Sequence, residues 1–392
     1  MRYFILLNLL AIINFCIAQE STTSSTSVLY NKVLNNAAAA NDLVASQGQF
    51  HFSPDGLMLT PRDGLVKLNR YYALAQRVVR YHIKLSADAI AVFQSDQADF
   101  KAAINMKEKT ISILTDPILQ KRALEMDPEH EYLVEIGRDY QQSSLRLIDL
   151  YTGLQTEVFG VNDGTGGVGQ GKENIGFLVG RQYDYYTFAL QEGTSLLVKQ
   201  ITVQANQTNP LLIIYGDSIT EPEGYYPTKS FDRSWTQLII NKLKGRAVSS
   251  GRGGTTINEL LLRIKNELPA LKPKYVMITI GTNGGNTEEN LSQLVEYIQE
   301  QGSIAILNNI PANESASHIQ VNKTLEKIRQ KYNIKGCKFE LATSINQLGN
   351  QVDESTMYFE DYDWGKIYHH PNVKGSRLMF LRTLLDVPEI YQ

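Results

Sequence analysis

The spacing of apolar residues changes once along this chain, near residues 204–210, and this change constrains the fold more than any other feature. Before it, apolar and polar residues alternate, most strictly over residues 79–85, as in a β-strand with one buried face. After it, short apolar runs alternate with segments whose apolar residues recur every three or four positions, as in amphipathic helices. Because 392 residues are also too many for one ordinary core, the sequence predicts two domains of different class.

The first domain is expected to span residues 50–205 and to be an all-β sandwich. Two apolar stretches, 145–150 and 154–159, flank the turn motif Tyr151-Thr152-Gly153 and predict a hairpin. Further short strands are expected at 110–114, 132–136, 175–179 and 195–203, and many short strands separated by turns are typical of antiparallel sandwiches. Residues 81–93 and the turn at 149–153 resemble the concanavalin-like, laminin-G-type jelly roll in pattern rather than in motif.

The second domain is expected to span residues 209–392. Short apolar strands are predicted at 211–215, 247–249, 275–280, 303–307 and 338–341, with amphipathic helices in the intervals. Gly245 and Gly302 lie where two of these helices should end. Strict alternation of strand and helix predicts a flavodoxin-like α/β/α domain with five parallel strands covered on both faces.

The first eighteen residues are expected to be a secretory signal peptide. Arg2 precedes a mostly apolar run over residues 4–17, and the small residues Cys16 and Ala18 suit cleavage after Ala18. A membrane anchor is the alternative, but the run is short for a bilayer and no second apolar segment follows. We therefore expect a secreted or periplasmic protein without a transmembrane segment. Residues 19–49 begin with a Ser/Thr-rich tract and are expected to be a flexible lead-in.

Composition and motif spacing argue against several classes of partner and cofactor. The net charge of -3 argues against a nucleic-acid-binding protein, because such proteins usually carry a basic surface. After loss of the signal peptide only Cys337 remains, so no intrachain disulfide is expected. The histidines lack ligand spacing for a metal, and the Gly-x-Gly-x-x-Gly pattern at 164–169 lies inside the β region rather than between a strand and a helix. We therefore expect no cofactor and no metal.

Four motifs fall at the carboxyl ends of predicted strands or before the last helix, where reactive groups collect in parallel sheets. They are Gly-Asp-Ser at 216–218, Gly-Arg-Gly-Gly at 251–254, Gly-Thr-Asn at 281–283 and His-His-Pro-Asn at 369–372. Taken alone, the last of these could be an ordinary helix start with Asn372 as its cap. In this order, however, the four resemble the four blocks of the SGNH/GDSL hydrolases, and the resemblance covers about residues 209–390.

The resemblance implies a serine esterase. Ser218 would be the nucleophile and His370 its general base, while the Gly254 N–H and the Asn283 side-chain amide would stabilise the oxyanion; Gly253 is the alternative glycine donor. The chemistry requires these groups, because a serine hydroxyl needs a base to take its proton and the developing oxyanion needs preorganised donors.

One position departs from the family pattern. The aspartate usually found three residues before the catalytic histidine is replaced by Ile367. Either Glu360, Asp361 or Asp363 orients His370, or a backbone carbonyl does so, as is thought for some carbohydrate esterases of this fold.

A small acyl group such as acetate on a polysaccharide is the expected substrate, by analogy with the pairing of a sandwich and a hydrolase domain. Two alternatives remain: a lipase or broad acyl-hydrolase, and a non-catalytic glycan-binding protein whose hydrolase domain has decayed. The sequence carries no signal for the oligomeric state.

Overall fold

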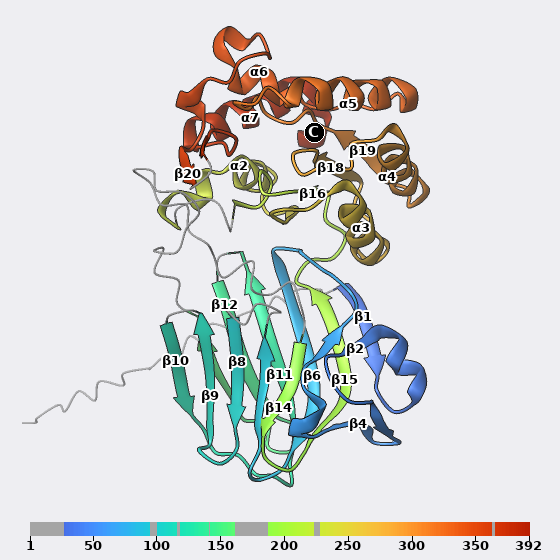
Figure 1. The fold of residues 1–392 in the computed structure, drawn as a ribbon, viewed down its shortest axis with the longest axis vertical. Helices are drawn as coiled ribbons and strands as arrows, with labels where there is room; N and C mark the ends of the chain where they lie inside the picture. Colours follow the sequence, from blue (N-terminus) through green and yellow to red (C-terminus); the bar gives the residue numbers. More distant parts are fainter. Residues whose placement is uncertain are drawn as a thin grey trace, which may run out of the picture.

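Two antiparallel sheets make up the first half of the chain, and a parallel sheet with helices makes up the second half (Figure 1). The computed structural model describes residues 27–94, 100–115, 118–140, 142–160, 187–222, 228–362 and 365–392. The predicted signal peptide, the Gly-rich pattern at 164–169 and the strand predicted at 175–179 lie outside these residues.

The two antiparallel sheets face each other as a sandwich. The larger sheet has the order β13-β12-β11-β6-β15-β4-β3, with β1 also paired to β15, and the smaller has the order β10-β9-β8-β7-β14-β5-β2. The larger sheet contains β1 (Ser27–Val33), β3 (His51–Ser53), β4 (Gly56–Leu59), β6 (Gln76–Leu85), β11 (Glu131–Asp139), β12 (Gln142–Asp149), β13 (Gln155–Phe159) and β15 (Leu196–Ala205). The smaller contains β2 (Leu43–Ala45), β5 (Val66–Leu68), β7 (Ile90–Gln94), β8 (Phe100–Asn105), β9 (Thr110–Thr115), β10 (Ile118–Ala123) and β14 (Thr187–Glu192).

Alternating apolar residues from both sheets form the core of the sandwich. Along β6 every second residue is buried, as the sequence pattern predicts. The Tyr81 ring of β6 lies 4.7 Å from the Phe93 ring and 5.4 Å from the Phe188 ring, and both of these belong to the opposite sheet. The predicted sandwich is therefore confirmed.

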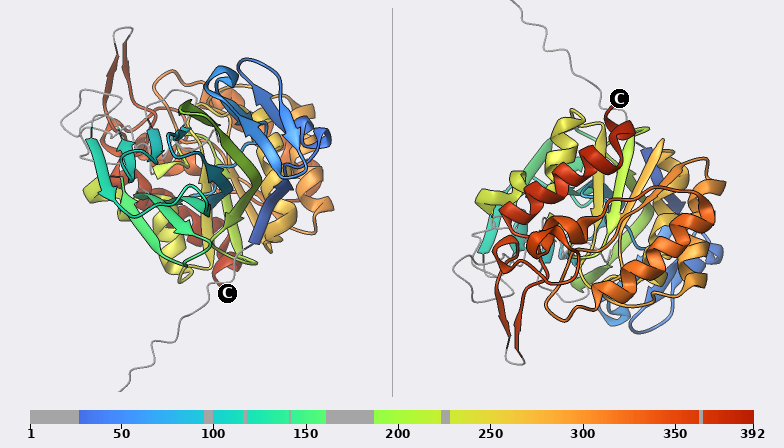
Figure 2. Two further views of the ribbon diagram at one scale, coloured as in Figure 1. Left: turned by 90° about the horizontal axis from the view of Figure 1, so that it is seen from below. Right: turned by 90° about the horizontal axis from the view of Figure 1, so that it is seen from above.

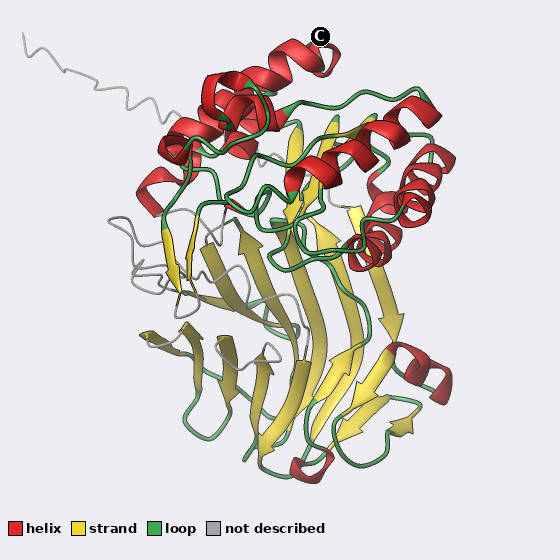
Figure 3. Cartoon of the chain, turned by 45° about the horizontal axis from the view of Figure 1, so that its top comes forward, coloured by secondary structure: helices red, strands yellow, loops and turns green. Residues whose placement is uncertain are grey.

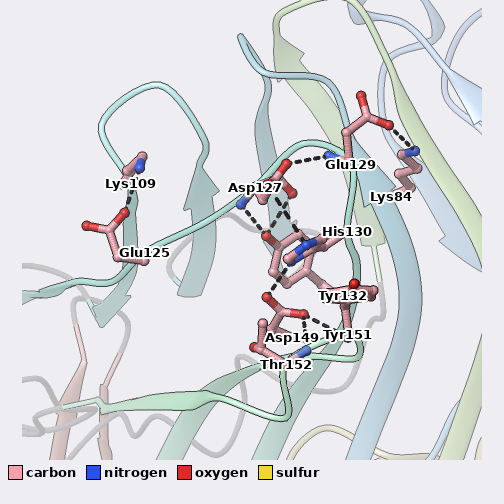
Figure 4. Close-up of polar contacts among 10 residues, drawn as sticks. All are labelled: Lys84, Lys109, Glu125, Asp127, Glu129, His130, Tyr132, Asp149, Tyr151 and Thr152. Carbon is pink, nitrogen blue, oxygen red and sulfur yellow. Dashed lines mark hydrogen bonds and ion pairs between the residues drawn. The ribbon is translucent and has the colours of Figure 1, made fainter.

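The predicted hairpin at 145–159 is also confirmed, and its turn is held by polar contacts (Figure 4). The Asp149 carboxylate accepts the N–H groups of Tyr151 and Thr152 at 2.8 and 3.1 Å, and its other oxygen lies 2.8 Å from His130 Nδ1. The exposed Tyr151 ring stacks on His130 with 4.6 Å between ring centroids. His130 thus fastens this turn to the loop that precedes β11.

The expectation of a flexible lead-in over residues 19–49 is wrong from residue 27 onward. β1 pairs with β15, a 3-10 helix spans Ala37–Asp42, and β2 pairs with β5. β1 buries only Tyr30 among its side chains, because it lies at a sheet margin with one residue turned to the core. Such a strand shows almost no apolar alternation, which is why its sequence does not reveal it.

The parallel sheet has the order β17-β16-β18-β19 and is covered by helices on both faces (Figure 3). Its strands are β16 (Leu212–Gly216), β17 (Ala247–Gly251), β18 (Tyr275–Thr279) and β19 (Ile304–Leu307). One face packs against α3 (Ile257–Leu271), α4 (Glu288–Glu300) and α5 (His318–Tyr332). The other packs against α2 (Trp235–Lys242), α6 (Phe339–Thr343) and α7 (Val373–Asp386). The α/β/α class and the first four strands are as predicted.

The fifth predicted strand, at 338–341, is wrong: these residues lead into α6. The chain does pass beside β19 just before this point, where Lys335 O accepts from Leu307 N and Cys337 O from Asn309 N, both at 2.9 Å. This contact amounts to an isolated bridge, so the described sheet has four strands. Phe339 and Ala342, three residues apart, both reach the core, and that spacing fits one helical turn better than a strand.

The two halves of the chain share a buried junction. β15 ends at Ala205 and β16 begins at Leu212, so the change in apolar spacing lies between them. Leu74 and Ala205 belong to the same apolar cluster as α3 and α4, and Ala75 N donates to Ser249 O of β17 at 2.9 Å. No helix in the described part of the chain is long and apolar enough to cross a membrane.

Candidate active site

Ser218 lies in a tight turn at the carboxyl end of β16. Every residue of this strand is buried. Thr220 N donates to Asp217 O at 3.0 Å, and the indole Nε1 of Trp235 donates to Ile219 O at 2.8 Å. These bonds hold the turn against α2, and Ser218 within it is 6% exposed.

His370 lies directly before α7, in a segment pinned by backbone bonds. Its carbonyl accepts from Tyr358 N at 2.8 Å. Asn372, the N-cap of α7, accepts from the N–H groups of the first helical turn and donates through Nδ2 to Ser355 O and Met357 O, both at 3.0 Å. Asn372 therefore caps the helix as its sequence position suggests, and His370 is 4% exposed.

The Asp217 carboxyl links the first and last motifs electrostatically. Burial raises its pKa to about 6, while the Ile219 N–H, the charge of His370, and the N–H and hydroxyl of Thr282 all act to lower it. His370 is therefore within electrostatic reach of the residue that precedes Ser218. Thr282 belongs to the third motif, so residues of the third and fourth motifs both influence the charge of this carboxyl from the first motif.

His369 lies against His370 but differs from it electrostatically. The centroids of the two imidazole rings are 3.9 Å apart. Burial, and secondarily the charge of His370, lowers the pKa of His369 to about 2. His369 therefore stays neutral at ordinary pH and adds no positive charge beside its neighbour.

The structure distinguishes the two glycines that the sequence leaves open as oxyanion donors. Gly253 N donates to the Glu221 carboxylate at 2.5 Å, so this N–H is already engaged. Gly254, with a φ of +76°, follows in a left-handed conformation. Among the described residues, neither the Gly254 N–H nor the Ser218 N–H has a hydrogen-bond acceptor. This geometry favours Gly254 over Gly253.

Asn283 is exposed in the loop after β18, and its amide is anchored on Thr255, the residue that follows the second motif. Nδ2 donates one hydrogen to Thr255 O at 3.1 Å. A primary amide has two N–H groups, and the second has no acceptor among the described residues. Asn283 can therefore donate one hydrogen bond to a ligand while remaining oriented by the other.

Glu221 is a residue of this region that sequence reasoning missed. Its side chain is fully buried, and its carboxylate lies 3.9 Å from Arg252 Nη1 as well as on Gly253 N. Gly251 permits this approach, because a Cβ there would stand 2.4 Å from the carbonyl carbon of Thr220. The sole sequence signal is an acidic residue three positions after Ser218, and its partner lies more than thirty residues away.

The acids that the sequence offers as partners of His370 precede it in the chain. Glu360 and Asp361 lie in a hairpin of β20 (Glu360–Tyr362) and β21 (Gly365–Ile367), which projects from the body of the domain (Figure 2). The side chains of Glu360 and Asp361, and Asp363 altogether, lie outside the described part of the structure. Glu314 is a further acid near this segment, since its carboxylate accepts from Tyr368 N at 2.9 Å, two residues before His370.

Comparisons with known proteins relate the α/β domain to one family. Residues 214–378 match the GDSL-like lipase/acylhydrolase family. Platelet-activating factor acetylhydrolase IB subunit alpha2 of Homo sapiens is 27% identical over 130 residues, which are 31% of this chain and 53% of that protein. The same subunit of Gallus gallus is 28% identical over 120 residues, 28% of this chain and 48% of that protein. The chain thus matches about half the length of these curated relatives.

Solved structures of esterases resemble the chain over a similar share. A catalytic mutant of an acetylxylan esterase from Geobacillus stearothermophilus has 18% identity, 47% coverage of this chain, 94% of that chain and a TM-score of 0.37. A GDSL-like lipase from Bacteroides thetaiotaomicron has 16% identity, 45% and 87% coverage and a TM-score of 0.36. The family match begins within β16 and ends within α7 and so spans all four motifs. Residues 214–378, which carry all four motifs, are therefore similar to the GDSL-like lipase/acylhydrolase family.

Proposed function

We propose that the α/β domain hydrolyses carboxylic esters through an acyl-enzyme on Ser218. The observations that carry the proposal are the electrostatic influence of His370 on Asp217, the residue before Ser218, and the family match that spans all four motifs. His370 takes the hydroxyl proton as Ser218 Oγ attacks the carbonyl carbon, and returns it to the leaving alcohol as the ester C–O bond breaks. Water then attacks the acyl group with His370 again as base, which frees Ser218 and the carboxylic acid.

Three donors are proposed to stabilise the oxyanion: the Ser218 N–H, the Gly254 N–H and the Asn283 amide. Two observations support this set, namely the engagement of Gly253 by Glu221 and the free second hydrogen of the Asn283 amide. By comparison with other oxyanion holes, loss of one donor costs about 3 kcal/mol of transition-state stabilisation.

Asp217 contributes a charge to the same site. With a pKa of about 6, its carboxyl is ionised at neutral pH and interacts electrostatically with His370. A negative charge at this position stabilises the imidazolium that forms when His370 takes the proton of Ser218. This role does not require Asp217 to orient the imidazole ring.

The proposed substrate is a small acyl group, such as acetate, on a polysaccharide, and the protein is proposed to be exported by its predicted signal peptide. The pairing of a β-sandwich with a hydrolase domain supports a polymeric carbohydrate. The relatives named as acetylhydrolases support a short acyl group. The near-complete burial of Ser218 and His370 also favours a small acyl group over a long chain.

Labelling with a fluorophosphonate tests the catalytic proposal. The wild-type protein should react, and Ser218→Ala and His370→Ala should not. If the wild type is not labelled, the domain is a non-catalytic module and the proposal is wrong.

A rate survey tests the proposed substrate. Acetylated oligosaccharides and aryl acetates should be cleaved faster than aryl esters of long acyl chains. A preference for long chains, with no cleavage of acetylated oligosaccharides, would identify a lipase instead.

A further inference from the structure

Helix α3 carries two buried charged residues one turn apart, at the junction with the sandwich (Figure 1). Neither Arg263 nor Glu267 is exposed to solvent. One oxygen of Glu267 accepts from Ala73 N at 2.7 Å and from Leu74 N at 3.2 Å. The other accepts from Ser250 Oγ at 2.8 Å. Glu267 therefore joins a segment of the sandwich domain to strand β17.

Arg263 makes the matching connection to strand β16. Its Nη2 donates to Gly216 O at 2.9 Å, and Gly216 lies two residues before Ser218. The guanidinium carbon also lies 5.6 Å from the centre of the Tyr71 ring, a residue of the sandwich domain. The segment 71–75 is thus connected to the ends of β16 and β17, the strands that lead into the loops carrying Ser218 and Gly254.

Burying the charged side chains of Arg263 and Glu267 costs free energy, which a purely structural contact between apolar residues would not. Burial raises the pKa of Glu267, while the neighbouring Arg263 and the hydrogen bonds from Ala73 and Ser250 lower it. Arg263 and Glu267 bond to other groups and not to each other, and buried charged groups can often be replaced by apolar residues with little loss of stability. They do fix geometry, because each charged group must keep its hydrogen bonds.

We propose that Arg263 and Glu267 are positioning residues that make the sandwich segment 71–75 a structural part of the catalytic centre. They fix the positions of Gly216 O and Ser250 Oγ relative to each other. They thereby set the distance between Ser218, which follows β16, and Gly254, which follows β17. This inference rests on the proposed function. It implies that the α/β domain depends on the sandwich for its rate and not only for substrate capture.

Arg263→Met tests the proposal, with Asn266→Ala as the matched control. Asn266 lies on the same helix and donates to Tyr71 O at 3.2 Å, but it contacts neither β16 nor β17. Arg263→Met should lower kcat and the rate of fluorophosphonate labelling about tenfold to a hundredfold, as small displacements in active sites do, with little change in KM for a short aryl ester. Asn266→Ala should leave kcat and labelling at wild-type values.

A second variant covers the case in which Arg263→Met does not fold. Ser250→Ala removes one hydroxyl and breaks the bond from Glu267 to β17. It should also slow labelling at a temperature where thermal unfolding shows the protein to be native. A merely structural role would lower the melting temperature of Ser250→Ala and leave the labelling rate of the native protein unchanged, and that result would overturn the inference.

The outcomes separate this inference from the proposed function. A wild-type protein that is not labelled refutes the esterase and the inference together. A labelled wild type, with Arg263→Met or Ser250→Ala labelled equally fast, refutes the positioning role alone.

Discussion

Replacing Asp217 by Asn should raise the free energy of unfolding relative to the wild type, and this gain should be larger at neutral pH than at acid pH. Burial raises the pKa of this carboxyl from 3.8 to about 6. Because the folded pKa lies above the unfolded one, the folded state binds the proton more tightly between these pH values. The carboxylate therefore costs stability above pH 6, and this cost disappears below about pH 4.

The magnitude follows from the shift. Raising a pKa by about two units corresponds to about 3 kcal/mol of lost stability once the group is ionised in both states. Between pH 4.5 and pH 8 the change amounts to about 2 kcal/mol, because the unfolded chain is already mostly ionised at pH 4.5. An asparagine side chain does not titrate in this range, so Asp217→Asn should gain about 2 kcal/mol on the wild type across this interval.

Urea unfolding of the wild type and Asp217→Asn at both pH values provides the measurement. The double difference cancels any effect of the substitution that does not depend on pH, such as a weaker bond from Ile219 N. Asp232→Asn, which removes an exposed carboxyl of the same domain, is the control and should show no such difference. If the stability difference between Asp217→Asn and wild type is equal at pH 4.5 and pH 8, the reasoning is refuted.

The same variant should be a poorer catalyst. Removing the Asp217 charge, which interacts electrostatically with His370, should lower kcat at pH 8 about tenfold. Stopped assays with an aryl acetate measure this directly. A variant that was both more stable and equally fast would show that Asp217 does not assist His370.

Three other substitutions probe the loops around the site. Glu221→Ala frees the Gly253 N–H and should lower kcat on an aryl acetate about tenfold or more. Glu221→Gln keeps an acceptor oxygen and should retain most of the rate. Equal losses in the two variants would contradict the role of the bond between Gly253 and Glu221. Gly251→Ala places a methyl group against the Thr220 backbone and should lower the free energy of unfolding in urea by about 1–3 kcal/mol. An unchanged urea midpoint would show that the turns containing Gly251 and Thr220 can move apart without cost. Asn372→Ala removes the cap of α7 and should cost about 1 kcal/mol; thermal unfolding at the wild-type temperature would disprove this.

Local patterns in the sequence predicted the elements that repeat a simple period. The alternation in β6 and the three- to four-residue spacing in α3 and α4 are properties of neighbouring residues, so the sandwich and the α/β/α domain could be derived without contacts. Elements with a weak period could not. β1 turns one residue to the core, and the segment at 338–341 mixes apolar and polar residues in an order that suits a strand or a helical turn.

The candidate site shows the same division. By itself the sequence determined the four motifs and their order, because glycine turns, a strand-end serine and a capped helix start are local features that sit where strands and helices end. Only the tertiary structure decided that Gly253 is engaged by Glu221, that His370 acts electrostatically on Asp217, and that Arg263 and Glu267 tie the sandwich to strands β16 and β17. Each of these contacts joins residues far apart in the chain, and burial, which sets their charges and hydrogen bonds, exists only after the two sheets have packed.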